Sequence, residues 1–86
     1  MPKIKLYASL RNVSGITEAM IPGKSVRDVL EALSGEFPEL QRVVFSGEQL
    51  RVIIALNGQT LAKETALETL VLDTDQIAIF PPVAGG

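Results

Sequence analysis

The sequence predicts an α+β domain in which one main helix packs on a sheet. Alternating apolar residues indicate strands near both ends of the chain, and one stretch between them has apolar residues at helical spacing. No repeat or linker divides the 86 residues, of which 47% are apolar. A chain of this length and composition holds one hydrophobic core, so we expect a single globular domain.

The first predicted strand covers residues 3–8, with the sequence KIKLYA. Apolar side chains recur along it at every second position, and this period of two is typical of a half-buried strand. Ile4, Leu6 and Ala8 are therefore expected to face the core. The same alternation turns Tyr7 outward.

A second strand is expected to pair with the first one. Residues 11–15 indicate a turn, and residues 16–21 can return along the first strand. Pro22 and Gly23 then end the pattern, because both residue types interrupt regular structure. The two strands would form a hairpin.

The main helix is predicted from the segment SVRDVLEALSG, which begins at Ser25. Ser25 is a suitable N-cap, with Asp28 three residues later as in a capping box. Gly35 is expected just past the end of the helix. The residues at helical spacing, which should face the core, are Val26, Val29, Leu30 and Leu33.

The second half of the chain is predicted to complete the sheet. Phe37, Leu40 and Val44 indicate a short helical turn after the main helix. The segment RVIIAL is rich in β-branched residues and is typical of a strand. The Asn57–Gly58 dipeptide after it favours a tight hairpin that returns over residues 59–61.

The last strand is predicted over residues 76–80, after a turn at residues 73–75. Its apolar residues again alternate, so Ile77 and Ile79 should be buried. Burying these two turns Phe80 outward, at the point where the strand ends.

The composition excludes several classes of function. The chain contains neither Cys nor His, and therefore lacks the thiolate nucleophile, the common metal ligands and the base that titrates near neutral pH. We expect no metal site and no catalysis by its own side chains. A net charge of −2 with scattered basic residues disfavours nucleic acid. No segment resembles a signal peptide or a membrane span, so we expect a cytoplasmic protein without a membrane partner.

The sequence ends in FPPVAGG, which predicts an extended tail. Pro81 and Pro82 cannot continue a strand ladder and hold an extended conformation. Gly85 and Gly86 have no Cβ and can enter a channel too narrow for side chains. We therefore divide the chain into a domain of residues 1–80 and a tail of residues 81–86. The tail would reach about 20 Å and deliver a C-terminal carboxylate into the active site of another protein.

These features resemble the ubiquitin-like β-grasp sulfur carriers, and FPPVAGG resembles in particular the small subunit of molybdopterin synthase. The resemblance extends through the segments LYASLRNVSG, SVRDVLEAL with the following FPEL, LNGQ and DTDQIAIFPP. Thr74 departs from the Gly that is common in that family, which affects only the geometry of a turn. The resemblance implies a ubiquitin-like β-grasp fold, with a mixed sheet packed on one main helix and a protruding Gly-Gly tail.

The resemblance also implies a mechanism. An ATP-dependent adenylating enzyme, similar to ubiquitin-activating enzymes, would convert the carboxylate of Gly86 to an acyl-adenylate, and a sulfur donor would replace AMP to leave a thiocarboxylate. The large catalytic subunit of molybdopterin synthase would then move the sulfur to a pterin precursor in molybdenum cofactor biosynthesis. This chain would be a non-catalytic carrier that binds no cofactor itself. The tail residues are Pro81, Pro82, Val83, Ala84, Gly85 and Gly86.

A partner-binding face is expected beside the tail. In the β-grasp arrangement the first and last strands are neighbours, so Tyr7 and Phe80 should form one apolar patch. Leu61, beyond the hairpin turn, is expected as a third member, and Arg11 as a charged contact at the rim. The alternative is that the two aromatic side chains cover the domain's own core.

Two alternative functions stay open at this point. Another β-grasp carrier, which serves thiamine synthesis, tRNA thiolation or protein conjugation, would use the same carboxylate. A non-covalent binding module with an inert tail would keep its activity after Gly85 and Gly86 were deleted. Function has to be argued from the site rather than from the fold.

Overall fold

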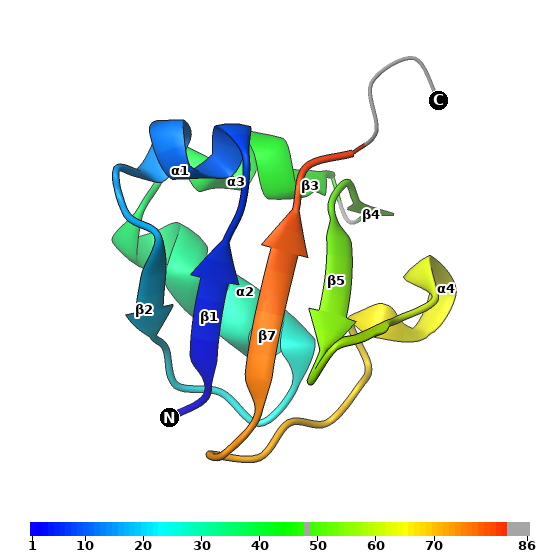
Figure 1. Ribbon diagram of the computed structural model, residues 1–86. Coiled ribbons are helices and arrows are strands. Elements are labelled where there is room, and N and C mark those ends of the chain that lie inside the picture. The colour runs from blue at the N-terminus through cyan, green and yellow to red at the C-terminus, as the bar shows by residue number, and fades with distance from the viewer. Residues whose placement is uncertain (48, 83–86) are drawn as a thin grey trace.

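The computed structural model describes residues 1–47 and 49–82. Within these residues, five strands form a mixed sheet in the order β2-β1-β7-β5-β6, and two short strands pair beside it (Figure 1). The elements are β1 (Lys3–Leu6), α1 (Ser9–Ser14), β2 (Glu18–Met20), α2 (Val26–Glu36), α3 (Leu40–Val44), β3 (Phe45–Ser46), β4 (Gln49–Leu50), β5 (Ile53–Leu56), β6 (Gln59–Thr60), α4 (Lys63–Ala66) and β7 (Gln76–Phe80). The predicted α+β class is confirmed.

The last strand lies in the middle of the sheet. β7 runs parallel to β1, from the pair Lys3 and Gln76 to the pair Leu6 and Ile79. β5 pairs with the other edge of β7 in antiparallel fashion, and β2 and β6 extend the sheet antiparallel to β1 and β5. β1 and β2 therefore form the predicted pair, and the first and last strands are neighbours as the β-grasp resemblance implied.

The hydrophobic core lies between α2 and one face of the sheet. Figure 1 shows α2 crossing behind β1 and β7. The residues predicted to face the core on these elements are all fully buried, and they are Ile4, Leu6, Val26, Val29, Leu30, Leu33, Ile77 and Ile79. Burial of such a side chain contributes about 1.5–3 kcal/mol, so these contacts are a major contribution to the stability of the fold.

α2 begins as predicted but ends later. The Ser25 side chain accepts a hydrogen bond from the Asp28 backbone N–H at 3.1 Å, which confirms the N-cap. Gly35, which we expected beyond the helix, lies within it. Phe37 is the C-cap, and its N–H donates to the Leu33 carbonyl at 2.8 Å. The Phe37 side chain packs against the core four residues after Leu33, and this contact prolongs the helix past the solvent-facing glycine.

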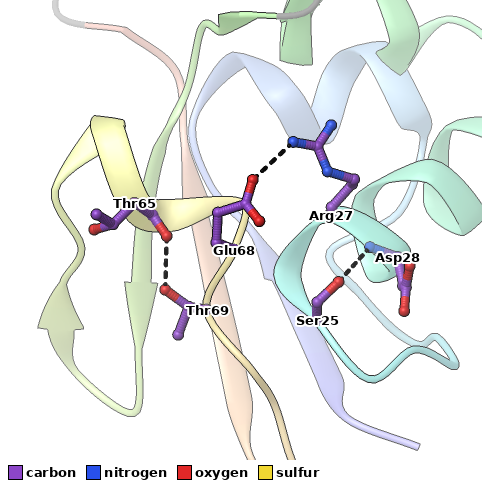
Figure 2. A network of polar contacts seen from close by, with 6 residues as sticks. All are labelled: Ser25, Arg27, Asp28, Thr65, Glu68 and Thr69. Atoms are coloured by element: carbon purple, nitrogen blue, oxygen red, sulfur yellow. Dashed lines mark hydrogen bonds and ion pairs between the residues drawn. The ribbon is translucent and has the colours of Figure 1, made fainter.

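The loop that follows α4 completes the N-terminus of α2, and neither α4 nor this contact was predicted. The backbone N–H groups of Val26 and Arg27 donate to the carbonyls of Thr69 and Leu67. The Arg27 guanidinium also pairs with the Glu68 carboxylate at 3.2 Å (Figure 2). The first helical N–H groups lack partners within the helix, so the loop supplies them.

The segment between β1 and β2 is a helix rather than the predicted turn over residues 11–15. Leu10 anchors α1 because its side chain is buried in the core, and Gly15 ends the helix with a left-handed backbone at φ 81°. Ala8 was expected to face the core and is exposed instead. The chain leaves the strand after Leu6 and turns at Ala8, where φ is 52°, so the alternation stops there.

Two predictions for the second half of the chain are confirmed. Leu40 and Val44 are buried from α3, the expected short helix. Asn57 and Gly58 form the hairpin turn between β5 and β6, with φ angles of 49° and 88°. Both angles are left-handed, as a two-residue turn that matches the twist of the sheet requires.

Candidate functional site

The predicted tail begins where β7 leaves the sheet. Phe80 is the last residue of β7, Pro81 is half-buried and Pro82 is exposed. Figure 1 places this end of β7 on the same side of the molecule as α1 and α3. The structure therefore shows where the base of the tail lies, at Pro81 and Pro82. The remaining predicted tail residues, which lie outside the described residues, are Val83, Ala84, Gly85 and Gly86.

Tyr7 and Phe80 form an aromatic pair at the base of the tail. The parallel register of β1 and β7 brings them together, and the Tyr7 backbone N–H donates to the Ile79 carbonyl at 3.2 Å. Their ring centroids are 4.6 Å apart with an angle of 15° between the ring planes. Both side chains are half-buried on the face of the sheet opposite the core. The prediction that the two aromatics share one outward face is confirmed.

Arg11 joins this pair from α1. Its Nε donates to the Leu6 carbonyl at 2.8 Å, and its guanidinium carbon lies 5.2 Å from the centroid of the Tyr7 ring. A guanidinium over an aromatic face is attracted by the ring quadrupole. Arg11 therefore holds the orientation of Tyr7. Because Arg11 is exposed, its remaining N–H groups are accessible to solvent or to a partner. The helix that replaces the expected turn is what brings Arg11 to this position.

Leu61 does not belong to the patch in which we expected it. The β5–β6 register, extended by the hydrogen bond from the Leu61 N–H to the Ile54 carbonyl at 2.9 Å, places Leu61 opposite Ile54. Residues that face each other across two strands lie on the same side of the sheet, and Ile54 is buried in the core. Leu61 accordingly packs against the core as a half-buried residue at the sheet edge.

Ile53 takes the place that was assigned to Leu61. It lies directly opposite Phe80 in the β5–β7 register and is half-buried. We call Tyr7, Phe80 and Ile53, which follow one another across β1, β7 and β5, the outer row. No described helix covers this side of the sheet (Figure 1). The signal that could have indicated Ile53 is the alternation of side chains along the segment RVIIAL. This signal does not decide between Ile53 and Ile54, because every residue in a continuous apolar run is suited to the core.

A polar turn closes the opposite end of the sheet. The Asp75 carboxylate accepts hydrogen bonds from the Asn57 side-chain amide at 2.9 Å and from the Leu72 backbone N–H at 2.7 Å. These two bonds, with Asn57 the larger cause, lower the pKa of Asp75 below its ordinary value. Asn57 also accepts from the Gln76 N–H at 2.9 Å. The carboxylate therefore ties the hairpin turn to the start of β7, which is a structural role.

The described residues contain neither a cluster of metal-ligating side chains nor a membrane-spanning helix. No three side chains of the types His, Cys, Asp or Glu in residues 1–47 and 49–82 gather closely enough to hold a metal ion. None of the helices described is both long and apolar enough to cross a bilayer. What the tail base does present is an uncovered aromatic and aliphatic row with a cation beside it. Such surfaces bind other proteins, because aromatic and arginine side chains dominate the energetics of interfaces.

Comparison with protein families gives one match over nearly the whole chain. Residues 4–86 match the model of the ThiS family. The match includes the outer row, Arg11 and the segment FPPVAGG. The matched range thus covers both the tail sequence and the surface at its base.

Individual relatives are similar over nearly their full length. The small archaeal modifier protein 3 of Haloferax volcanii is 32% identical, covering 98% of this chain and 97% of that protein. The molybdopterin synthase sulfur carrier subunit of Arabidopsis thaliana is 31% identical, covering 98% of this chain and 81% of that protein. The solution structure of the small archaeal modifier protein 1 of Methanosarcina acetivorans superposes with a TM-score of 0.86 at 38% identity, covering 98% of this chain and 94% of that one.

Proposed function

This chain belongs to the ThiS family of ubiquitin-like β-grasp sulfur carriers, and from that premise we propose that it is the sulfur-carrier subunit of molybdopterin synthase. The observation that carries the proposal is the combination, within one family match, of the Gly-Gly tail and the outer row at its base. A tail of this kind needs a partner that receives it, and the outer row supplies a surface for that partner.

The proposed chemistry takes place at the C-terminal carboxylate of Gly86. A carboxylate is a poor electrophile, so a separate adenylating enzyme, similar to ubiquitin-activating enzymes, transfers AMP from ATP to it and releases pyrophosphate. A hydrosulfide equivalent from a sulfur donor then attacks the acyl carbon, AMP leaves and a thiocarboxylate remains. Because the chain contains no Cys, it cannot carry sulfur as a persulfide. The acyl carbon of Gly86 is thus the carrier atom, and ATP is a substrate of the partner rather than a cofactor of this chain.

The tail residues differ in their proposed roles. Pro81 and Pro82 continue from β7 as a stiff stalk, because neither residue can donate a ladder hydrogen bond. Val83 and Ala84 extend the reach, and Gly85 and Gly86 pass the narrowest part of the partner's channel. A Gly85→Val variant should therefore block transfer and leave the melting temperature of the domain unchanged.

The outer row is the proposed docking surface for the large catalytic subunit. Tyr7 and Phe80 are the anchors, and Ile53 continues the apolar surface away from the tail. The adjacent Arg11 keeps free N–H groups for a polar contact at the rim. Two rigid stacked rings lose little conformational freedom on binding, which favours aromatic anchors where the direction of the tail has to be fixed.

A second candidate function is that of a protein modifier. It is favoured by the similarity to the small archaeal modifier proteins, which includes the 38% identity to the solution structure from Methanosarcina acetivorans. The adenylation step would be the same, but the activated carboxylate would pass to a lysine amine instead of receiving sulfur. Carriers for thiamine synthesis or tRNA thiolation would share the thiocarboxylate and differ only in the protein that accepts the sulfur.

Intact mass spectrometry after reconstitution separates these functions. The chain is incubated with its cognate adenylating enzyme, ATP and sulfide, and we expect one oxygen to be replaced by sulfur. A variant without Gly86 is the matched control and should not change in mass. The thiocarboxylated chain is then mixed with the large synthase subunit and the pterin precursor. Sulfur transfer supports the proposal, whereas lysine-linked products without sulfur transfer would identify a modifier.

A further inference from the structure

A hollow lies beside the base of the tail, at the end of the sheet rather than on its outer face. It has a volume of about 200 Å³ and is lined by Ser9, Leu10, Val43, Arg51, Pro81 and Pro82. Leu10 is fully buried, and Val43 and Pro81 are half-buried, so the hollow has an apolar floor. The two prolines have no N–H to offer a ligand. Pro81 and Pro82, the first two residues of the predicted tail, form one wall of this hollow.

Arg51 gives the hollow a charged rim. Its guanidinium donates from Nη1 to the Arg42 carbonyl at 2.9 Å, and its backbone N–H donates to the Val44 carbonyl at 2.8 Å. Both carbonyls belong to the last turn of α3, where a cation is favoured. Arg51 is thereby oriented through one of its five donor N–H groups. The others retain the planar fork that binds a carboxylate through two hydrogen bonds.

Three arginine side chains lie around the tail base. Arg11 on α1, Arg42 on α3 and Arg51 between β4 and β5 all lie at this end of the molecule, and none of them takes part in an ion pair within the described part of the chain. The lining of the hollow includes no acidic side chain, although Glu39 borders a neighbouring hollow with Arg42. The whole chain nevertheless has a net charge of −2. This end therefore complements an acidic surface.

We propose that the hollow and Arg51 form a docking site for an acidic segment of the enzyme that adenylates the tail. An apolar side chain of that segment fills the hollow against Leu10 and Val43, and a neighbouring carboxylate binds the Arg51 fork. This inference rests on the proposed function. An enzyme that holds ATP needs cations in its active site, so the rim around that site is where it can carry carboxylates complementary to the arginines. The outer row stays available for the large synthase subunit.

Charge reversal at Arg51 tests the electrostatic part of the proposal. The cognate adenylating enzyme is assayed by ATP–pyrophosphate exchange, with the carrier as the varied substrate. For Arg51→Glu we expect the KM for the carrier to rise about tenfold at an unchanged kcat, and for Arg51→Lys a smaller rise. Lys24→Glu makes the same charge change in the exposed loop before α2, at the opposite end of the molecule (Figure 1). It should stay within about twofold of wild type because exposed charges that far away are screened.

Filling the hollow tests the apolar part without a change of charge. Ser9 is exposed at the start of α1, and Ser9→Trp introduces a ring that can occupy the hollow. We expect the KM to rise about as much as in Arg51→Glu, with the melting temperature preserved. This variant also decides the question if Arg51→Glu destabilises the end of α3.

The outcomes are distinct. In the first outcome, the wild-type chain supports ATP–pyrophosphate exchange, but the KM is the same for Arg51→Glu, Ser9→Trp and Lys24→Glu. This result would overturn the docking site and leave the proposed function standing. Weaker binding of Arg51→Glu to the large synthase subunit, with unchanged exchange, would also overturn it. A wild-type chain that supports no exchange would overturn the proposed function itself, and the docking site with it.

Discussion

The two faces of the central sheet are built from the same strands, yet they differ in what covers them. The residues of the outer row are half-buried on the side that no described helix covers. The residues next to them in sequence form an inner row that is almost completely buried against α2, and its members are Leu6, Ile54 and Ile79. Two residues that are adjacent in a strand thus lie on opposite faces of the sheet, one in the core and one at the surface.

This difference separates stability from recognition within a very short stretch of sequence. Side chains of the inner row are removed from water when the chain folds. Side chains of the outer row keep part of their exposed surface after folding, and this part can be buried when a partner binds. Substitutions of adjacent residues should therefore have opposite consequences. The following experiments test this by measuring the free energy of unfolding, the affinity for a partner or the pKa of a single group.

The largest effect is expected from the adjacent residues Ile53 and Ile54. Ile54→Ala should lower the free energy of unfolding by about 2–5 kcal/mol, because it leaves a cavity in the core. Ile53→Ala removes the same atoms from the outer face and should cost less than about 1 kcal/mol. Urea unfolding of both variants provides the measurement. Equal losses would contradict the division between the two faces.

The aromatic pair should show the reverse pattern. We expect Phe80→Ala and Tyr7→Ala each to weaken binding to the large synthase subunit by about 1–3 kcal/mol, the range for truncated anchor residues. The loss of the stacked pair should cost only about 0.5–1.5 kcal/mol of stability. Calorimetric titration and thermal melts of the same samples decide the point. Unchanged affinity in both variants would show that the pair is not part of the binding surface.

Leu61 sharpens the comparison because it lies at the edge of the sheet. Since it packs against the core, Leu61→Ala should reduce stability by about 1 kcal/mol and leave the affinity for the large subunit unchanged. The matched variant is Ile53→Ala, which should weaken the affinity instead. If Leu61→Ala weakened binding and left the free energy of unfolding unchanged, Leu61 would belong to the binding surface instead of the core.

The smallest effect is a dependence of stability on acid pH through Asp75. Its pKa is lower in the folded chain, so the stabilisation is fully present above the pKa of the unfolded chain and is lost as the pH falls through the folded pKa. In Asn57→Ala, which removes the larger cause, the pKa of Asp75 should rise toward its ordinary value. NMR titration of the Asp75 carboxyl carbon measures it. A titration curve that did not shift in this variant would show that the Leu72 N–H alone sets the pKa.

Local patterns in the sequence were sufficient for much of the fold. The alternation over residues 3–6, the Ser25 cap and the Asn57–Gly58 turn each depend on residues within a few positions of one another. The outward direction of both Tyr7 and Phe80 followed from the same alternation. These predictions succeeded because short-range geometry determines them.

The remaining features depend on contacts between distant segments. Residues 11–14 are helical because Leu10 is anchored in the core, and Gly35 stays in α2 because Phe37 packs beyond it. Leu61 was placed on the wrong face because its direction depends on the register between β5 and β6, and an error of one residue in register exchanges the two faces. Ile53 was missed for a related reason. It and both of its neighbours are apolar and equally suited to the core, so the sequence does not show which of them faces outward.

The position of β7 between β1 and β5 has a consequence for how the protein is made. The central parallel ladder joins the segment around Lys3 to the segment around Gln76, so the middle of the sheet stays open during synthesis until β7 has left the ribosome. Pairing between such distant segments is also slow compared with local folding. The tail continues directly from that strand, and a chain with an unfinished sheet has no fixed base from which to present it. Under the proposed function, an activating enzyme would therefore be offered a tail with a fixed base only after β7 has paired with β1 and β5.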